Sequence, residues 1–313
     1  MKRLTPVRIF EFCRIKLANL CKAMHPSSTP FLSGDTFRSL CHVQIDQDAS
    51  KIDISKGVAR LCFHADKSVV CLFVDLHLVQ DDQSEEFLLE EFGRLPADVR
   101  TKTKIVFHNH DKLPSLNFFK CLNDLCFDTF CVNIIDESVS VTPLPIGLEN
   151  RWRLNNGRIS PFVDAQLRLK RRDPRSQMVF AAFDVRTNYP ERSVARQACI
   201  EAGVSFYDHR ISPRLHRRLL LDTHFVISPP GNGLDCHRTW EAIYLGCVPV
   251  VLRRALADEF TTSLPIHAVD NWIDFLDLSE SEKFSLYLDT RARSTELAFA
   301  PYWRRRLHDV KSR

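Results

Sequence analysis

The chain has 313 residues, of which 44% are hydrophobic, and this supports one large or two ordinary domains with buried cores. The formal net charge of +4 is small for this length, so the composition gives no reason to expect a nucleic-acid partner. Apolar runs stay well short of the roughly 18 residues that a membrane-spanning helix needs, so no such helix is predicted.

The 11 cysteines are odd in number and scattered, and several stand inside apolar runs. We therefore expect reduced core residues of a cytoplasmic protein and no disulfide framework. The cysteines in apolar runs are Cys62, Cys71, Cys121 and Cys126. Because Cys121, Cys126 and Cys131 stand five apart, which matches no zinc-binding spacing, neither a metal site nor a cofactor is predicted.

Residues 1–24 combine basic and apolar side chains. A signal peptide is not predicted because Glu11, Arg14 and Lys16 interrupt the apolar core that it would need. Two structures fit the pattern: a basic amphipathic helix docked on the fold, which is favoured, or a peripheral helix on an anionic membrane surface. Residues 25–30 have the composition of a linker and complete this N-terminal segment, 1–30.

A first lobe is predicted over 31–167. It contains β-rich stretches at 69–79, 103–108 and 131–135. The second of these ends in a polar cluster of histidine, asparagine and aspartate at 108–111. Polar side chains just after a strand's carboxyl end are where open α/β sheets bind ligands, so we expect this lobe to contribute to a site.

A basic linker over 168–176 is predicted to separate this lobe from a second lobe at 177–313. In the second lobe, strands alternate with helices. The predicted strands cover 177–183, 204–207, 225–227 and 248–252, and the helices cover about 190–202, 213–221, 236–245 and much of 282–310. This alternation indicates a parallel, doubly wound α/β sheet.

The most informative stretch of the chain is 225–252. Its apolar start, 225–227, has the length and β-branching of a buried strand, and it stops at Pro229 and Pro230, which cannot donate to a sheet ladder. The glycine loop that follows, 231–233, lets the backbone approach a ligand closely.

A helix over about 236–245 follows this loop, with Asp235 predicted as its N-cap and Gly246 as its C-cap. The unpaired N–H groups at the start of such a helix favour an anion such as a diphosphate. Near that end, Glu241 lies one turn from His237 and Arg238. These three residues either form an ion pair on a solvated face or bind a nucleotide, with the carboxylate on ribose hydroxyls and the guanidinium on phosphate.

The motif over 228–242 and 245–250 resembles the nucleotide-sugar-binding motif of exostosin-like glycosyltransferases and the related motif of α1,3-fucosyltransferase-type enzymes. Both have the GT-B architecture of two Rossmann-like, doubly wound lobes facing a cleft. The resemblance implies that Arg238 and Glu241 contact the donor nucleotide, Glu241 on its ribose. It covers about thirty residues well. In GT-B proteins the last helix often crosses back to the first lobe, which is the implied course of the C-terminal helix here.

The donor-binding set predicted from this motif and from the strand ends around it includes two further arginines, Arg186 and Arg192, for which a surface role is an equal alternative. The set is Ser228, Gly231, Asn232, Gly233, Asp235, His237, Arg238, Glu241, Arg186 and Arg192. With helix N-terminal amides, these arginines would neutralise a diphosphate without a metal ion.

The base that deprotonates the acceptor hydroxyl is expected on the first lobe, across the cleft. Asp111 is favoured because it follows a strand end beside two histidines, one of them His108, the second predicted catalytic residue. The further candidates are Asp75, Asp35, Glu149 and His110. Each of these side chains has a cap or turn role as its alternative.

The leading functional hypothesis is a glycosyltransferase that moves a sugar from a nucleotide-sugar donor to a glycan or lipid-linked acceptor, such as a glycolipid. Two alternatives stay open: a non-catalytic nucleotide- or glycan-binding module on the same fold, and an epimerase or hydrolase that acts on the nucleotide sugar itself.

Overall fold

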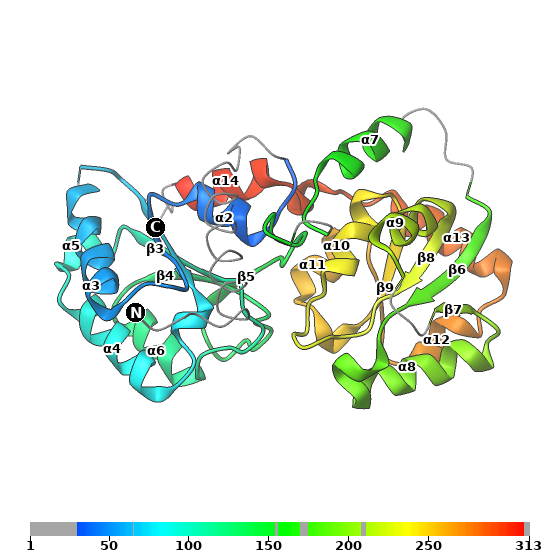
Figure 1. Cartoon of the computed structure of the whole chain (residues 1–313), viewed down its shortest axis with the longest axis horizontal. Coiled ribbons are helices and arrows are strands. Elements are labelled where there is room, and N and C mark those ends of the chain that lie inside the picture. Colours follow the sequence, from blue (N-terminus) through cyan, green and yellow to red (C-terminus); the bar gives the residue numbers. More distant parts are fainter. Residues whose placement is uncertain (1–29, 65, 154–155, 170–174, 208–210, 310–313) are drawn as a thin grey trace, which may run out of the picture.

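A computed structural model describes residues 30–64, 66–153, 156–169, 175–207 and 211–309. They form two α/β lobes, each built on a five-stranded parallel sheet (Figure 1). The predicted amphipathic segment at 1–24 and the middle of the predicted basic linker, 170–174, lie outside the described residues. Arg175 is described, and its guanidinium donates to three backbone carbonyls of the second lobe, so this end of the linker is docked.

The first lobe has its strands in chain order, all parallel. The strands are β1 (Val43–Ile45), β2 (Val70–Asp75), β3 (Thr103–His108), β4 (Asp128–Val132) and β5 (Val141–Leu144). The helices in this part of the chain are α2 (Gly34–Leu40), α3 (Lys51–Ala59), α4 (Asp82–Gly93), α5 (Ala97–Arg100), α6 (Leu116–Asp124) and α7 (Ser160–Leu169).

This strand order makes the prediction of a doubly wound first lobe wrong. Right-handed crossovers between strands that follow chain order all fall on one face of the sheet, and α3, α4 and α6 pack side by side there. The opposite face is covered by α2 and by the C-terminal helix α14 (Ala300–His308), both of which contact β2. Alternation along the sequence predicts a parallel sheet but carries no information on strand order.

The second lobe has the strand order β10-β9-β8-β6-β7, again all parallel, and it is doubly wound as predicted. The strands are β6 (Gln177–Ala182), β7 (Ser205–Tyr207), β8 (Thr223–Ile227), β9 (Val248–Leu252) and β10 (His267–Val269). The helices are α8 (Tyr189–Glu201), α9 (Pro213–Asp222), α10 (His237–Tyr244), α11 (Asp258–Ser263), α12 (Trp272–Leu276) and α13 (Glu280–Arg291). The strand order reverses between β6 and β8, which is the topological switch point of this sheet.

One hydrophobic core runs through both lobes. Alternate side chains of a strand point to opposite faces, so Cys71 and Phe73 of β2 face α14 while their neighbours face α3 and α4. The α14 side of the first sheet continues without a break into the α10 side of the second, where Trp240 and Tyr244 are fully buried. The last helix therefore packs on the first lobe and joins the two lobes (Figure 1).

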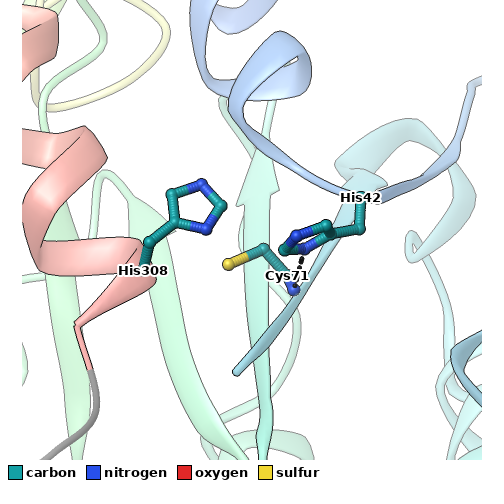
Figure 2. Close-up of side chains that lie close together, drawn as sticks. All are labelled: His42, Cys71 and His308. Carbon is teal, nitrogen blue, oxygen red and sulfur yellow. Dashed lines mark hydrogen bonds between the residues drawn. The ribbon is translucent and has the colours of Figure 1, made fainter. Parts of the chain in front are cut away.

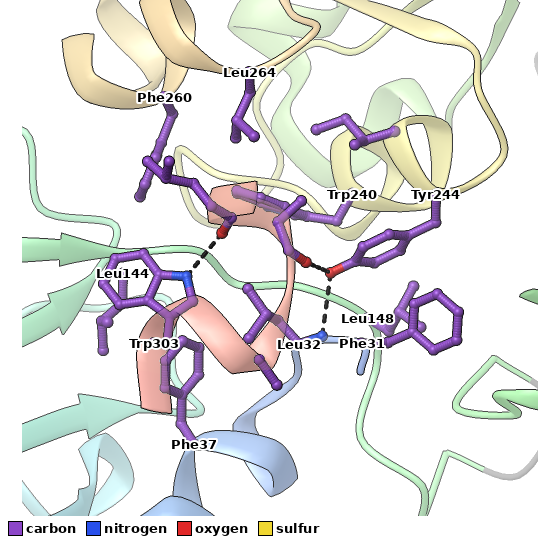
Figure 3. Packing of buried hydrophobic residues seen from close by; sticks show 14 of the residues in the cluster. Phe31, Leu32, Phe37, Leu144, Leu148, Trp240, Tyr244, Phe260, Leu264 and Trp303 are labelled. Carbon is purple, nitrogen blue, oxygen red and sulfur yellow. Dashed lines mark hydrogen bonds between the residues drawn. The ribbon is translucent and has the colours of Figure 1, made fainter. Parts of the chain in front are cut away.

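Tyr244 connects three segments of this core with its hydroxyl group (Figure 3). The hydroxyl donates to the Ala298 carbonyl at 2.6 Å and accepts from the Leu32 amide at 3.1 Å. Replacing Tyr244 by phenylalanine leaves both backbone groups buried without this partner. We expect the free energy of unfolding to fall by about 1–3 kcal/mol, measured by urea denaturation. Tyr189→Phe, at an exposed side chain, is the control and should leave it unchanged.

The nine described cysteines are all free, but not all of them are core residues. Cys62 and Cys126 are exposed and Cys121 is half-buried, so their placement inside apolar runs misled the prediction for them. Within the described residues, no helix has both the length and the apolar character to cross a membrane.

Candidate functional site between the lobes

A cavity of about 570 Å³ lies between the two lobes, at the carboxyl ends of their strands. The first lobe contributes the residues that follow β3 and β5, including Asp111 and Glu149. The second lobe contributes the residues that follow β6 and β8, the two strands at its switch point. Ligands of open α/β sheets bind outside the carboxyl ends of strands at such a point, so the topology and the cavity agree on one location.

The glycine loop 231–233 forms one wall of this cavity and touches the first lobe. A Cβ atom on Gly233 would stand 2.8 Å from the Asp111 Oδ1 and 2.7 Å from the Asn133 Nδ2. A Cβ atom on Gly231 would stand 2.9 Å from the Arg192 Nη2. A larger residue at either position would displace these side chains, so the two glycines let the loop approach them closely.

Asp235 does not cap α10, so that prediction is wrong. The N-cap is Cys236, whose side chain makes no capping hydrogen bond. The buried Asp235 carboxylate instead accepts from the Ile146 amide at 2.9 Å and from the Trp240 Nε1 at 2.8 Å. Burial raises the pKa of Asp235 to about 6, against the opposing effect of these hydrogen bonds. Asp235 thus fixes the loop to the first lobe, and it also lines the cavity.

The raised pKa of Asp235 predicts the sign of a pH effect on stability. The folded state retains the proton of Asp235 between about pH 4 and pH 6, where the unfolded state has lost it. Since the folded state binds more protons there, this group's contribution to stability falls as pH rises through that range. Relative to Asp235→Asn, which cannot titrate, wild type should lose about 2 kcal/mol between pH 4 and pH 6, measured by denaturant unfolding. A difference that is flat or that rises with pH would contradict this assignment.

His237 also bridges the lobes. Its Nδ1 lies 2.8 Å from the Gly147 carbonyl oxygen, to which it donates, and its Nε2 lies 3.7 Å from the Glu149 Oε2. The imidazole lines the cavity, and its second nitrogen lies near a carboxylate of the first lobe.

Arg238 lies in the first turn of α10 and lines the cavity. Its Nη1 is fully buried and has no hydrogen-bond partner among the residues that the structure describes. Burial lowers the pKa of Arg238 to about 10, with the nearby positive charge of Arg192 acting in the same direction. Both guanidinium groups lie beside the Phe183 ring, at 5.7 and 5.9 Å from its centroid. Two cations and an unpaired donor next to a cavity favour an anionic ligand.

Arg192 is buried under the glycine loop. Its Nε donates to the Pro230 carbonyl at 2.8 Å and its Nη1 to the Asp184 carbonyl at 2.9 Å. These two bonds hold the guanidinium at the cavity wall. Arg186 lies elsewhere: its side chain is 89% exposed, pairs with the Asp184 carboxylate at 2.8 Å and is not part of the cavity wall.

Glu241 is half-buried at the cavity wall, one turn along α10, and its partner is not the arginine of the motif. Its Oε2 lies 3.2 Å from the Nδ1 of His216 on α9. Burial alone would raise the pKa of Glu241, but the hydrogen bond from His216 and the surrounding positive charge lower it below its usual range. The solvated ion pair that spacing allowed is therefore absent within the described residues, and Glu241 presents an ionised carboxylate to the cavity.

Two further residues of the predicted donor set differ in their placement. Asn232 is exposed and lines the cavity. Ser228 is buried behind it, with its Oγ 3.0 Å from the Thr239 Oγ1 and its amide donating to the Val250 carbonyl, and it is not among the cavity residues. Ser228 thus stabilises the start of the loop without contacting the cavity.

No protein-family model matches this chain, and no curated protein matches it either.

Asp111 is the predicted base that lies best for a reaction in the cavity. Its carboxylate lines the wall, faces the glycine loop, and makes no hydrogen bond or ion pair with another residue of the described part of the chain. Glu149 and His110 also line the cavity, whereas Asp75 and Asp35 do not. The Asp75 carboxylate pairs with His77 at 2.7 Å, and the second oxygen of Asp35 accepts from a backbone amide at 2.9 Å.

His108 is unsuited to the proton-transfer role that the sequence suggested. It is buried, its Nδ1 accepts from the Asn109 amide at 2.8 Å, and its Nε2 lies 3.3 Å from the Pro145 carbonyl oxygen, to which it donates. Burial lowers its pKa to about 4. Both ring nitrogens are therefore used inside the protein, and His108 holds the turn that follows β3.

Three residues of the cavity region were missed from the sequence. Asn133, in a left-handed conformation at φ 62° after β4, accepts from the Asp235 amide at 2.9 Å. His216 pairs with Glu241, and Phe183 lies beside both cavity arginines. An asparagine directly after a strand is a recognisable signal for Asn133. His216 and Phe183 carry no such signal, because their roles depend on how α9 and β6 are placed.

Proposed function

We propose that this protein is a glycosyltransferase of GT-B architecture that transfers a sugar from a nucleotide-sugar donor to a glycan or lipid-linked acceptor, without a metal ion at the diphosphate. The observation that carries the proposal is the buried, unpartnered Nη1 of Arg238 at the wall of the interlobe cavity. A buried donor of this kind lacks its partner until an anion binds.

The arrangement of charges around Arg238 fits a nucleoside diphosphate. Arg238, Arg192 and the N-terminal amides of α10 would neutralise the diphosphate and, after transfer, the charge that develops on the leaving group. Glu241, one turn farther along, would accept hydrogen bonds from ribose hydroxyls. In this proposal the second lobe binds the donor and the first lobe supplies the base and the acceptor wall.

A panel of nucleotide sugars, read by thermal shift, tests this proposal most directly, because a ligand that binds only the folded protein raises its melting temperature. A glycosyltransferase should be stabilised by one donor class and should release nucleotide only when acceptor is supplied. Stabilisation without release under any condition would favour a binding module. Release that needs no acceptor would favour an epimerase or hydrolase.

The proposed ribose contact makes a separate prediction. Glu241→Ala should remain folded but lose most of its donor affinity, measured by calorimetry with the nucleotide sugar that the panel selects. The loss should be about tenfold or more, as expected for hydrogen bonds from ligand hydroxyls to an ionised carboxylate. His216→Gln, which removes the partner of Glu241 but keeps the carboxylate, is the matched comparison and should lose less. Unchanged donor affinity in Glu241→Ala would count heavily against the proposal.

A further inference from the structure

A cluster of metal-ligating side chains lies on the far side of the first sheet from α3 and α4, away from the residues that line the cavity. His42 directly precedes β1, Cys71 is the second residue of β2, and His308 is the last residue of α14. One ligand atom from each of the three lies within 4.8 Å of the others (Figure 2). We propose that His42, Cys71 and His308 form a binding site for a thiophilic transition-metal ion, with Zn²⁺ the best match.

Sheet register and helix packing bring these residues together. The pairing of Val43 with Leu72 places His42 beside Cys71, and the His42 amide donates to the Cys71 carbonyl at 2.9 Å. The Cys71 side chain points to the face of the sheet that α14 covers, where its thiol donates to the Leu307 carbonyl at 3.3 Å. The next residue along the helix is His308, so the thiol lies between the two imidazole rings (Figure 2).

The hydrogen bonds of the cluster resemble the outer contacts of metal ligands. The His308 Nε2 lies 2.9 Å from the Leu40 carbonyl, to which it donates, and this leaves the lone pair of its Nδ1 for a metal ion. A backbone carbonyl that fixes the tautomer of a histidine is the usual outer contact of a histidine ligand. The His42 Nδ1 accepts from the Cys71 amide at 3.0 Å. The His42 ring would lose this one neutral hydrogen bond when it binds a metal ion.

The donor set selects the kind of metal. One sulfur and two imidazole nitrogens suit Zn²⁺ or a comparable transition metal and do not suit Mg²⁺ or Ca²⁺, which take oxygen ligands. Ligand atoms of a tetrahedral zinc site lie about 3.5 Å apart. A separation of up to 4.8 Å therefore requires a shift of about 1 Å, which the half-buried rings of His42 and His308 allow. A water molecule would complete the tetrahedron.

Binding is accompanied by the release of one proton. The Cys71 thiol donates to the Leu307 carbonyl, so it carries its proton in the metal-free protein. The S–H bond breaks as the sulfur–metal bond forms, and the proton passes to the buffer. The metal then joins the C-terminal helix to the first two strands of the first lobe. This inference is independent of the proposed glycosyl transfer.

Zinc titration of the full chain against a chromophoric chelator tests the site. The two thiols that are exposed in the described part of the chain should first be removed, so the parent carries Cys62→Ser and Cys126→Ser. We expect one tight Zn²⁺ per chain in this parent, and Co²⁺ in place of zinc should show the absorption of a thiolate ligand. His308→Gln, at the last residue of α14, should weaken zinc binding by at least about tenfold.

His267→Gln, in the edge strand of the second lobe, is the matched histidine control and should bind zinc like the parent. Cys71→Ser should abolish the cobalt–thiolate absorption. If that variant does not fold, loss of the zinc-dependent rise in melting temperature in His308→Gln provides the same test. Failure of the parent to bind zinc stoichiometrically, or equal affinity in His308→Gln, would overturn the proposal.

Discussion

Replacing Arg238 by methionine is expected to weaken the binding of a nucleoside diphosphate by about a hundredfold, as is typical when a charge-assisted contact to phosphate is lost. The physical reason is the state of its guanidinium, whose Nη1 is buried and lacks a partner among the described residues. Burial of an unpaired donor on a cation is unfavourable in the free protein. The same variant should therefore be at least as stable as wild type when no ligand is present.

A variant that is at least as stable as wild type but binds the nucleoside diphosphate more weakly has lost a binding residue and not a structural one. Calorimetry with the nucleoside diphosphate measures the affinity, and urea unfolding without ligand measures the stability. Arg186→Met removes the same charge from an exposed side chain outside the cavity wall, and it should change neither quantity. An Arg238→Met variant that unfolds more easily and binds normally would show that Arg238 supports the fold instead.

The second lobe and its loop were largely predictable because their signals are local. Strand 225–227, the glycine loop and the next strand were found where expected. The C-cap of α10 is Leu245, one residue before the predicted Gly246, and Gly246 follows it with a left-handed φ of 72°. The role of the Asp235 carboxylate was predicted wrongly. An aspartate just before a helix fits a cap, but its actual partners, Ile146 and Trp240, include a backbone amide 89 positions away.

In the first lobe, the alternation of strands and helices along the sequence could not predict the order of the strands in the sheet. Strand order is decided by long-range packing, so the single-sided winding and the role of α14 in covering the second face became visible only in three dimensions. The same holds for Glu241. Spacing along α10 related it to Arg238, whereas its partner is His216 on the neighbouring helix. Residues that touch through tertiary packing leave no periodic trace in the sequence.

Asp111→Asn is expected to lower the rate of sugar transfer by about 10²–10⁴-fold, the usual contribution of a positioned general base, with little change in donor affinity. Asparagine retains the shape of the side chain beside Gly233 but cannot accept a proton from the acceptor hydroxyl. Initial rates at saturating donor and acceptor measure the loss. The thermal shift produced by the donor shows whether the donor site is intact.

Glu149→Gln is the matched control, because Glu149 is the other cavity carboxylate on the first lobe that was predicted as a candidate base. The Glu149 carboxylate lies 3.8 Å from the Arg153 Nε and 3.7 Å from the His237 Nε2, whereas Asp111 makes no ion pair with another residue of the described part of the chain. A general base must be able to turn toward the acceptor hydroxyl, and the Asp111 carboxylate is not held by such partners. If Glu149→Gln loses transfer and Asp111→Asn keeps it, the base is Glu149 and the acceptor approaches from the α10 side of the cavity.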